Sequence, residues 1–229
     1  MKRIFITFIL FTCLSGPLIS AEDTNKQVPD VSIGINANIG SFDLYDKNVN
    51  LGTKPGLYTG GGISLEKMIY TNFGIGTGIQ YRYFNADFVM DDGATTYDAT
   101  WTFQTINIPF LMILSFSGGE TALNLAGGIV YSHVFYSVME TDSDAVLKKE
   151  DNVLRFTNTN QIGLTAGILF KIKATEYTDF VFGIMGEYYP TNLLYHAGDS
   201  GDRLNMTNYS LTTGYMFRTY LFPGSANKN

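Results

Sequence analysis

Few residues of this sequence could carry out acid–base or nucleophilic chemistry. Its two histidines are His133 and His196, and histidine is the side chain best suited to proton transfer near neutral pH. If residues 121–136 form a strand, Ser137 shares a face with His133 but lies about 13 Å along the chain, beyond the reach that a nucleophile and its base need. A partner for His133 would have to come from another strand. We therefore expect no catalytic residue, with His133 at an interface and His196 in a glycine-rich loop.

A second group of candidates is acidic. The stretch MDDGATTYD, residues 90–98, gathers Asp91, Asp92 and Asp98, but it lacks the regular oxygen ligands and the final Glu of an EF-hand loop. We expect a solvated acidic loop, with weak contact to divalent ions as the alternative. No metal site and no cofactor are predicted.

The chain begins with the pattern of a secretory signal peptide. MKR supplies a positive start, IFITFILFTCLSG is a short apolar stretch and PLISA ends in small residues, as in cleaved leaders. We expect cleavage after Ala21. An amino-terminal membrane anchor is the alternative, but the apolar run is shorter than the ~20 residues of a spanning helix.

Composition excludes several classes of protein. The only cysteine, Cys13, lies in the leader, so the mature chain has neither disulfides nor cysteine-based zinc sites. The net charge of -6 argues against nucleic acid, which requires a basic face. No later segment stays apolar for 18 residues, so any crossing of a membrane would use strands.

Eight later segments alternate with the two-residue period of a β-strand. In FGIGTGIQYRY, Ile75 and Ile79 fall on one side of the chain and Arg82 on the other, because successive side chains of a strand point opposite ways. An even number of strands can close into an antiparallel barrel with both ends on one side. The segments are 31–40, 56–70, 72–84, 103–116, 121–136, 160–173, 179–189 and 208–222.

The connections between these segments alternate in length. Those at 71, 117–120 and 174–178 are short, whereas 41–55, 85–102, 137–159 and 190–207 are long and hold thirteen of the 21 acidic residues. Short periplasmic turns and long extracellular loops are typical of outer-membrane barrels. We therefore predict an all-β fold, an eight-stranded antiparallel transmembrane β-barrel with four long extracellular loops.

The polar face of the strands is too poor in charge to meet bulk water. Glycine, serine and asparagine dominate it, whereas a water-exposed face carries charge at about a quarter of its positions. We infer that it lines a narrow lumen, which side chains fill. Arg82 is expected to pair with Glu187 near the outer end and a second cluster to form around Glu66, unless a wet lumen solvates each charge separately. The charged lumen residues are Glu66, Arg82, Lys171, Glu187 and Arg218.

Aromatic residues gather at the ends of the apolar face. Rings at both edges of an aliphatic band suit lipid headgroups. The alternative is a soluble lipocalin-like barrel with its apolar face turned inward around a ligand, but its outer wall would then be almost uncharged. The predicted aromatic girdle consists of Tyr81, Tyr83, Tyr131, Phe135, Tyr188, Tyr215 and Phe217.

The segment FQTINIPFLMIL, with Asn107, Ile108 and Pro109 at its centre, resembles a known pattern. Its order of aromatic, polar, IP and aliphatic residues is similar to the PorT-like outer-membrane β-barrel domain family of Bacteroidetes and related bacteria. LNLAGGIVYSH, IGLTAGILFKIK and YSLTTGYMF extend the resemblance over nearly the whole mature chain. It implies a small Gram-negative outer-membrane barrel, a bulge or missing bond at Pro109, and an aromatic insertion signal ending at Phe217 or Phe222.

These inferences combine into one predicted organisation. Residues 1–21 are the signal peptide, 22–30 a periplasmic segment, 31–222 the outer-membrane barrel and 223–229 a short tail. We predict a non-enzymatic protein without a cofactor, in contact with outer-membrane lipid, lipopolysaccharide and the insertion machinery. Its loops would bind a protein partner, or the barrel would support the envelope. The alternatives are a small-solute channel or, because similar barrels hydrolyse or acylate lipid A, a lipid-modifying enzyme.

Overall fold

The computed structural model describes residues 31–45, 55–91, 96–143, 146–154, 157–193 and 205–219, most of which are in strands. The predicted signal peptide, periplasmic segment and tail lie outside these ranges, as does Phe222. Within the described ranges, no helix is long and apolar enough to cross a membrane.

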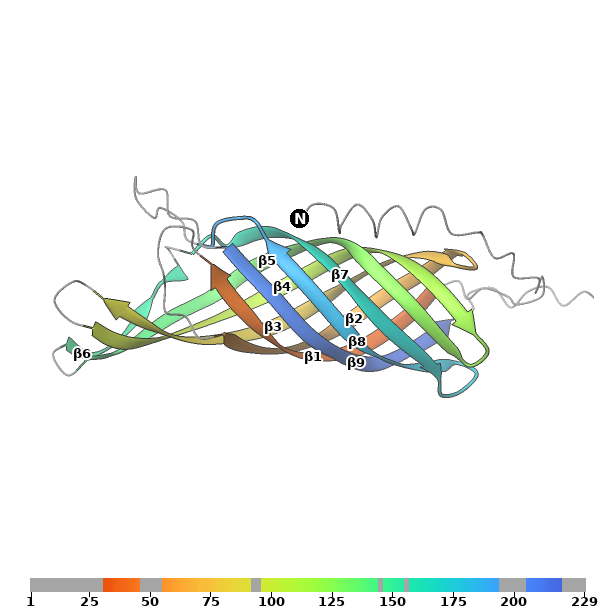
Figure 1. The fold of residues 1–229 in the computed structure, drawn as a ribbon, viewed down its shortest axis with the longest axis horizontal. Coiled ribbons are helices and arrows are strands. Elements are labelled where there is room, and N and C mark those ends of the chain that lie inside the picture. Colours follow the sequence, from red (N-terminus) through yellow and green to blue (C-terminus); the bar gives the residue numbers. More distant parts are fainter. Residues whose placement is uncertain are drawn as a thin grey trace, which may run out of the picture.

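The described strands form one antiparallel sheet that closes on itself (Figure 1). Its hydrogen-bonded order is β4-β3-β2-β1-β9-β8-β7-β5-β6, and pairing of β4 with β5 closes a barrel of eight strands. The remaining strand, β6, pairs with the end of β5. Closure leaves no unpaired strand edge in the barrel wall. The strands are β1 (Val31–Tyr45), β2 (Gly56–Tyr70), β3 (Phe73–Asp91), β4 (Thr96–Gly118), β5 (Thr121–Ser143), β6 (Val146–Asn152), β7 (Asn160–Lys173), β8 (Thr178–Tyr189) and β9 (Asn205–Thr219).

The alternation seen in the sequence sets which side chains face inward. In β3, Arg82 is buried whereas its neighbours Tyr81 and Tyr83 are exposed. The same division holds in β9, where Ser210 is buried and Leu211 is exposed. The buried face of each strand therefore lines the lumen, and the exposed face forms the outer wall.

Short turns gather at one end of the barrel and long connections at the other (Figure 1). The tight turn between β4 and β5 uses Gly119 with a φ of 67°, a left-handed conformation that glycine adopts at little cost. Two of the connections predicted to be long loops, 85–102 and 137–159, are instead mostly strand. They form the hairpins β3–β4 and β5–β6, which extend beyond the other strands.

These hairpins escaped the sequence pattern for a physical reason. Backbone pairing of β3 with β4 continues out to Asp91 and Thr96, and it does not depend on one face being apolar. Alternation is strong only where one face meets an apolar environment. In the described part of the β3–β4 hairpin the alternation is reversed, because Ala86, Ala99 and Trp101 are buried whereas Asp87 and Asp98 are exposed. A search for strands whose apolar face continues the outer wall therefore ends where the paired strands leave the wall.

Two of the irregularities in strand pairing bear on the sequence predictions. Pairing of β3 with β4 passes from Thr77–Phe110 directly to Gln80–Asn107, so the stretch that contains Pro109 has no partner in β3. The resemblance to the PorT-like family implied a bulge or a missing bond here, and the structure has a gap in pairing.

The second irregularity lies in β5. Gln104 pairs with Tyr136 but Thr105 pairs with Val134, which leaves Phe135 as an extra residue, a β-bulge. The bulge changes the faces beyond it, so Ser137 is 1% exposed and faces the interior. The expectation that Ser137 shares a face with His133 is therefore wrong.

Candidate functional site

The lumen contains a buried ion pair towards the end from which the hairpins extend. Arg82 of β3 donates through Nη1 to Glu187 Oε2 and through Nη2 to Glu187 Oε1 at 2.7 Å. These residues are 105 positions apart in the sequence and lie on strands that are not neighbours in the barrel. Arg82 is 4% exposed and Glu187 6%, so both charges are removed from bulk solvent.

Other polar groups complete the hydrogen bonding of this pair. Arg82 Nη2 also donates to Gln80 Oε1 at 2.8 Å, and the guanidinium lies 5.4 Å from the ring centre of Tyr58. On the acidic side, Tyr189 donates its hydroxyl to Glu187 Oε2 at 3.0 Å and Asn208 Nδ2 donates at 3.3 Å. The pair is thus held by several partners, as buried charges require.

Asn107 links this network to the wall formed by β4 and β5. With its amide oriented to satisfy both ends, Oδ1 accepts from Arg82 Nη1 at 3.0 Å, while Nδ2 donates to Ser132 at 2.7 Å and to Thr105 at 2.9 Å. Asn107 is fully buried. Asn107, the first residue of the Asn107–Ile108–Pro109 motif, therefore accepts a hydrogen bond from Arg82. Pro109 lies two positions further along the strand, on the same face.

A group of stacked rings, here called the aromatic cluster, fills the lumen beyond the ion pair. Phe84 stacks on Phe103 with ring centres 4.5 Å apart, and Tyr58 stacks on Phe84 at 4.9 Å. Phe42 meets Phe84 edge-on at 5.1 Å, and Trp101 lies 5.2 Å from Phe103. All of these rings are buried, so apolar side chains occupy the end of the lumen nearest the hairpins.

Two more ion pairs lie near the short turns. Lys171 Nζ contacts Glu66 Oε2, and Arg218 Nε donates to Asp179 Oδ2 at 2.9 Å. The structure thus brings Glu66 together with Lys171, whereas Arg218 takes a partner that the sequence interpretation missed. The two-residue alternation of β8 could have identified Asp179 as a lumen residue, because Asp179 shares a face with Glu187.

A band of apolar side chains, here called the inner apolar layer, lies beside the Lys171–Glu66 pair, since Lys171 Nζ is 3.4 Å from Met216 Sδ. Its members lie on β4, β5, β7, β8 and β9 and pack on one another inside the barrel. The lumen therefore contains apolar as well as charged regions. The layer consists of Ile113, Ala126, Leu169, Val181 and Met216.

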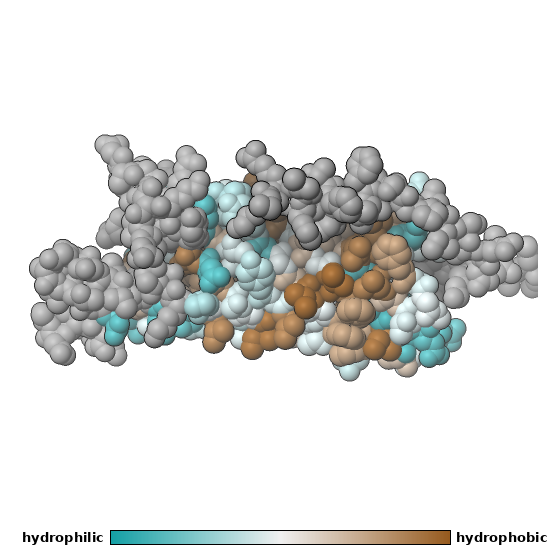
Figure 2. Space-filling model, viewed as in Figure 1, coloured by the Kyte–Doolittle hydropathy of each residue, from teal (hydrophilic) through white to brown (hydrophobic). Residues whose placement is uncertain are grey.

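The outer wall is apolar, with aromatic residues towards both ends. Figure 2 shows apolar residues over the middle of the visible face and hydrophilic residues towards its ends. The predicted girdle residues Tyr81, Tyr83, Phe135, Tyr188, Tyr215 and Phe217 are all exposed, and Tyr131 is partly exposed. Tyr215 and Phe217 lie in the half of β9 nearest the short turns, and the other five lie towards the hairpins.

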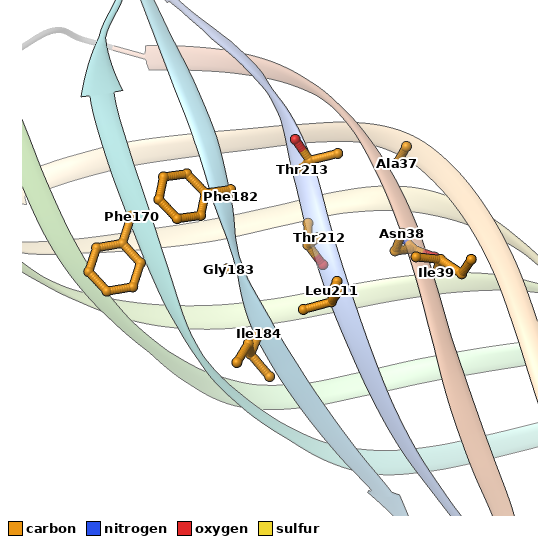
Figure 3. A pocket seen from close by; sticks show the side chains of 10 residues that line it. All are labelled: Ala37, Asn38, Ile39, Phe170, Phe182, Gly183, Ile184, Leu211, Thr212 and Thr213. Carbon is orange, nitrogen blue, oxygen red and sulfur yellow. The ribbon is translucent and has the colours of Figure 1, made fainter. Parts of the chain in front are cut away.

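A shallow hollow in the outer wall spans β1, β9, β8 and β7 (Figure 3). The small side chains of Ala37 and Thr213 face each other in paired strands at its floor. Phe170 and Phe182, stacked at 5.3 Å, stand on one side, and Ile184 and Leu211 on the other. The hollow is apolar and open, so it offers packing surface but no group that could perform chemistry.

The residues considered for catalysis or metal binding do not assemble into a site. His133 Nδ1 lies 3.1 Å from Asn160 Oδ1, which also accepts a hydrogen bond from the Tyr131 hydroxyl at 2.5 Å. The bulge turns Ser137 inward, where Trp101 Nε1 donates to it at 2.9 Å. Within the described ranges, no group of three His, Cys, Asp or Glu residues could hold a metal ion. His196 and Asp92 lie outside those ranges.

Comparisons with known proteins agree on the fold. The structure is similar to the outer membrane protein OprG from Pseudomonas aeruginosa, with a TM-score of 0.55 and 12% sequence identity over 85% of this chain and 97% of that chain. It is also similar to a major outer membrane protein from Thermus thermophilus, with a TM-score of 0.54 and 14% identity over 82% and 98% of the two chains. At this identity the likeness shows the fold alone, the closed barrel of small outer-membrane proteins.

Sequence comparisons add no family. No protein-family model matches the chain, and no curated protein matches it. The PorT-like resemblance is therefore not confirmed and stays an inference from short motifs.

Proposed function

We propose that this protein is an integral outer-membrane β-barrel that contacts lipid all around its wall and displays acidic hairpins on the cell surface. Its role there is non-enzymatic, either to bind a protein partner or to support the envelope. The PorT-like resemblance is consistent with this assignment. The lumen is closed by its own side chains in the resting protein.

The apolar outer wall is the observation that carries this proposal. Every barrel strand contributes a large aliphatic side chain that is at least half exposed. A soluble monomer rarely exposes a continuous apolar patch of more than a few hundred Å², whereas hydrocarbon solvates such a wall at no cost. A lipocalin-like arrangement would turn these residues inward, and the structure turns them outward. One such residue from each strand is Ile35, Ile63, Ile79, Met112, Ile129, Leu164, Ile184 and Leu211.

The height of the wall also fits a bilayer. On β3, the outward aromatic residues Phe73 and Tyr83 are ten positions apart, which in a strand tilted by about 40° corresponds to ~25 Å along the barrel axis. The apolar band of outer-membrane barrels is also about 25 Å tall. The hollow lined by Phe170, Phe182 and Leu211 lies within this band, where lipid chains would pack against it.

The hairpins support a surface-binding role. Asp87, Asp98 and Glu140 are exposed on them, and binding residues are commonly displayed on extensions of a rigid scaffold. Enzymatic activity finds no support among the described residues, because His133 contacts the side-chain amide of Asn160, which also accepts from the Tyr131 hydroxyl, rather than a nucleophile.

Detergent dependence tests the membrane assignment. The mature chain, residues 22–229, is refolded either in plain buffer or with a non-ionic detergent micelle, and its size is followed by light scattering. We expect a folded, monodisperse protein with detergent and aggregation without it. A monodisperse folded protein in plain buffer would refute the proposal.

Surface display is tested separately on intact cells. Protease added outside should cut within 85–102 or 137–159, and replacing both hairpins by short turns should abolish partner binding while the barrel still folds. Ion conductance in planar bilayers, or altered lipid A in a deletion strain, would instead favour the channel or the enzyme.

A further inference from the structure

The lumen beside the Arg82–Glu187 pair contains buried oxygen atoms that have no donor. Among the described residues, nothing donates to Oδ1 of Asn38 or Asn208 or to Oγ1 of Thr165. These residues are 6%, 0% and 5% exposed. Unpartnered buried polar atoms are uncommon in folded proteins and call for a bound water or ion.

The register brings these oxygens close to the ion pair. Thr165 pairs with Glu187 across β7 and β8, and Asn208 pairs with Glu187 across β8 and β9. On β1, which is the neighbour of β9, Asn38 pairs with Gly60, which pairs with Arg82. Paired residues of neighbouring strands point to the same face of a sheet, so all three side chains point into the lumen around the ion pair.

A further oxygen without a donor lies beside this group. Asn36, whose Oδ1 has no donor among the described residues, pairs with Gly62 on one side and Gly214 on the other. Asn36 is only partly buried although it faces inward. The lumen beside Asn36 is therefore polar and is not completely filled by side chains.

Apolar groups lie towards both ends of this space. The aromatic cluster lies on the side of the hairpins. The inner apolar layer lies on the side of the short turns, where Met216 also contacts Lys171 of the Lys171–Glu66 pair. Narrow apolar constrictions exclude water and ions even where the surrounding wall is polar.

We propose that the lumen holds a hydrated chamber, in which the oxygens of Asn36, Asn38, Thr165 and Asn208 bind water and small cations, and that the aromatic cluster is its outer closure. Because the three asparagine Oδ1 atoms can only accept hydrogen bonds, and the Thr165 hydroxyl can accept as well as donate, they take ligands that donate hydrogen bonds or carry positive charge. The ring stacking of Phe84 on Phe103 holds the closure in place. The inference rests on the barrel spanning a membrane as proposed above.

Cysteine labelling tests this proposal without background, because the mature chain has no cysteine. Thr165→Cys is introduced into the full barrel, which is reconstituted in phosphatidylcholine vesicles and treated from outside with a small cationic thiosulfonate reagent. Only a hydrated thiol that can ionise reacts readily. The rate is compared between the intact aromatic cluster and Phe84→Ala/Phe103→Ala, with Tyr81→Ala/Tyr83→Ala on the outer wall as the matched control.

We expect slow labelling with the intact cluster and in the control, and labelling at least ~10-fold faster when the cluster is truncated, since an apolar constriction no longer excludes water. An anionic reagent of the same size should react several-fold more slowly than the cationic one. Equal rates with the intact and truncated cluster, or a faster anionic reagent, would overturn the proposal.

Two controls keep the result interpretable. Heat-dependent migration on gels shows whether each variant is folded, and flotation with vesicles shows whether it is inserted. If the unmodified barrel does not insert, the membrane assignment is contradicted. If the Thr165→Cys barrel inserts but its thiol stays unreactive when the aromatic cluster is truncated, the chamber is contradicted. If the double variant does not fold, Phe103→Leu, which removes the stacked ring but keeps apolar bulk, replaces it with the same expected direction.

Discussion

The Arg82–Glu187 pair gives the sharpest prediction for stability. Glu187→Gln preserves the shape of the side chain but removes its charge, which leaves the Arg82 guanidinium inside the lumen without a counter-ion. Both side chains are 5% exposed, so solvent screening is small. Removing one partner of a buried pair costs about 3–5 kcal/mol.

The structure places the expected value near the lower end of this range. Arg82 keeps its hydrogen bond to Gln80 and its contacts with Asn107 and the ring of Tyr58. The amide oxygen of the introduced Gln can also accept the hydrogen bonds that Tyr189 and Asn208 donate to Glu187 Oε2. We therefore expect destabilisation of about 3 kcal/mol.

The chain supplies its own probe for the measurement. The single tryptophan, Trp101, is buried in the aromatic cluster, so its fluorescence reports unfolding of the outer lumen. Urea unfolding in lipid vesicles gives the free energy from the midpoint and the slope.

A matched control separates charge burial from general disruption. Arg82→Met/Glu187→Leu removes both charges, and replacing a buried pair by apolar residues is often neutral, so this double variant should recover most of the loss. A free energy of unfolding for Glu187→Gln within ~0.5 kcal/mol of the unmodified protein, the range of ordinary surface substitutions, would show that the lumen solvates the arginine and would refute the reasoning.

Three other perturbations test the second ion pair, the outer wall and the orientation. Glu66→Gln should cost less than Glu187→Gln, about 1–2 kcal/mol in the same assay, because its partner Lys171 is more exposed and exposed pairs contribute less; an equal or larger loss would contradict this. Ile79→Arg places a charge on the middle of the outer wall and should destabilise the barrel in vesicles by about 2–4 kcal/mol, whereas Ile79→Leu should stay within ~1 kcal/mol; equal stability of the two variants would count against lipid contact. Protease on intact cells should leave the barrel strands uncut, and cleavage within the turn at 174–178 would show that the orientation is reversed.

Much of the barrel could be predicted from alternation, because each strand meets an apolar environment on one face only. That condition holds along the wall, so the two faces of β3 could be assigned from Ile79 and Arg82. It is reversed in the β3–β4 hairpin, where Ala86, Ala99 and Trp101 are buried and Asp87 and Asp98 are exposed. The strand ends were therefore misplaced, although the number of barrel strands was predicted.

The lumen was harder to predict than the wall. The two-residue alternation places Phe84 and Phe103 inward. An aromatic residue near the rim also fits a lipid-facing girdle, however, and only the full register of strand pairing distinguishes a lumen position from a girdle position. The bulge at Phe135 shifts every later residue of β5 by one face, and no local signal in the sequence marks it. Asp179 was missed because it lies at the very start of β8, where strand boundaries are least certain.

The ion pairs of the lumen contribute to closure rather than to the formation of single hairpins. Arg82 joins β3 to β8 and Lys171 joins β7 to β2, and in both cases the two strands are not adjacent in the barrel. A hairpin of two neighbouring strands gains nothing from these contacts, because the partner charge arrives only when the sheet curls round. Before closure each charge is solvated; after closure in a wrong register each would be buried alone, at a cost of several kcal/mol. The same charges that make the lumen polar therefore select the register in which the barrel closes.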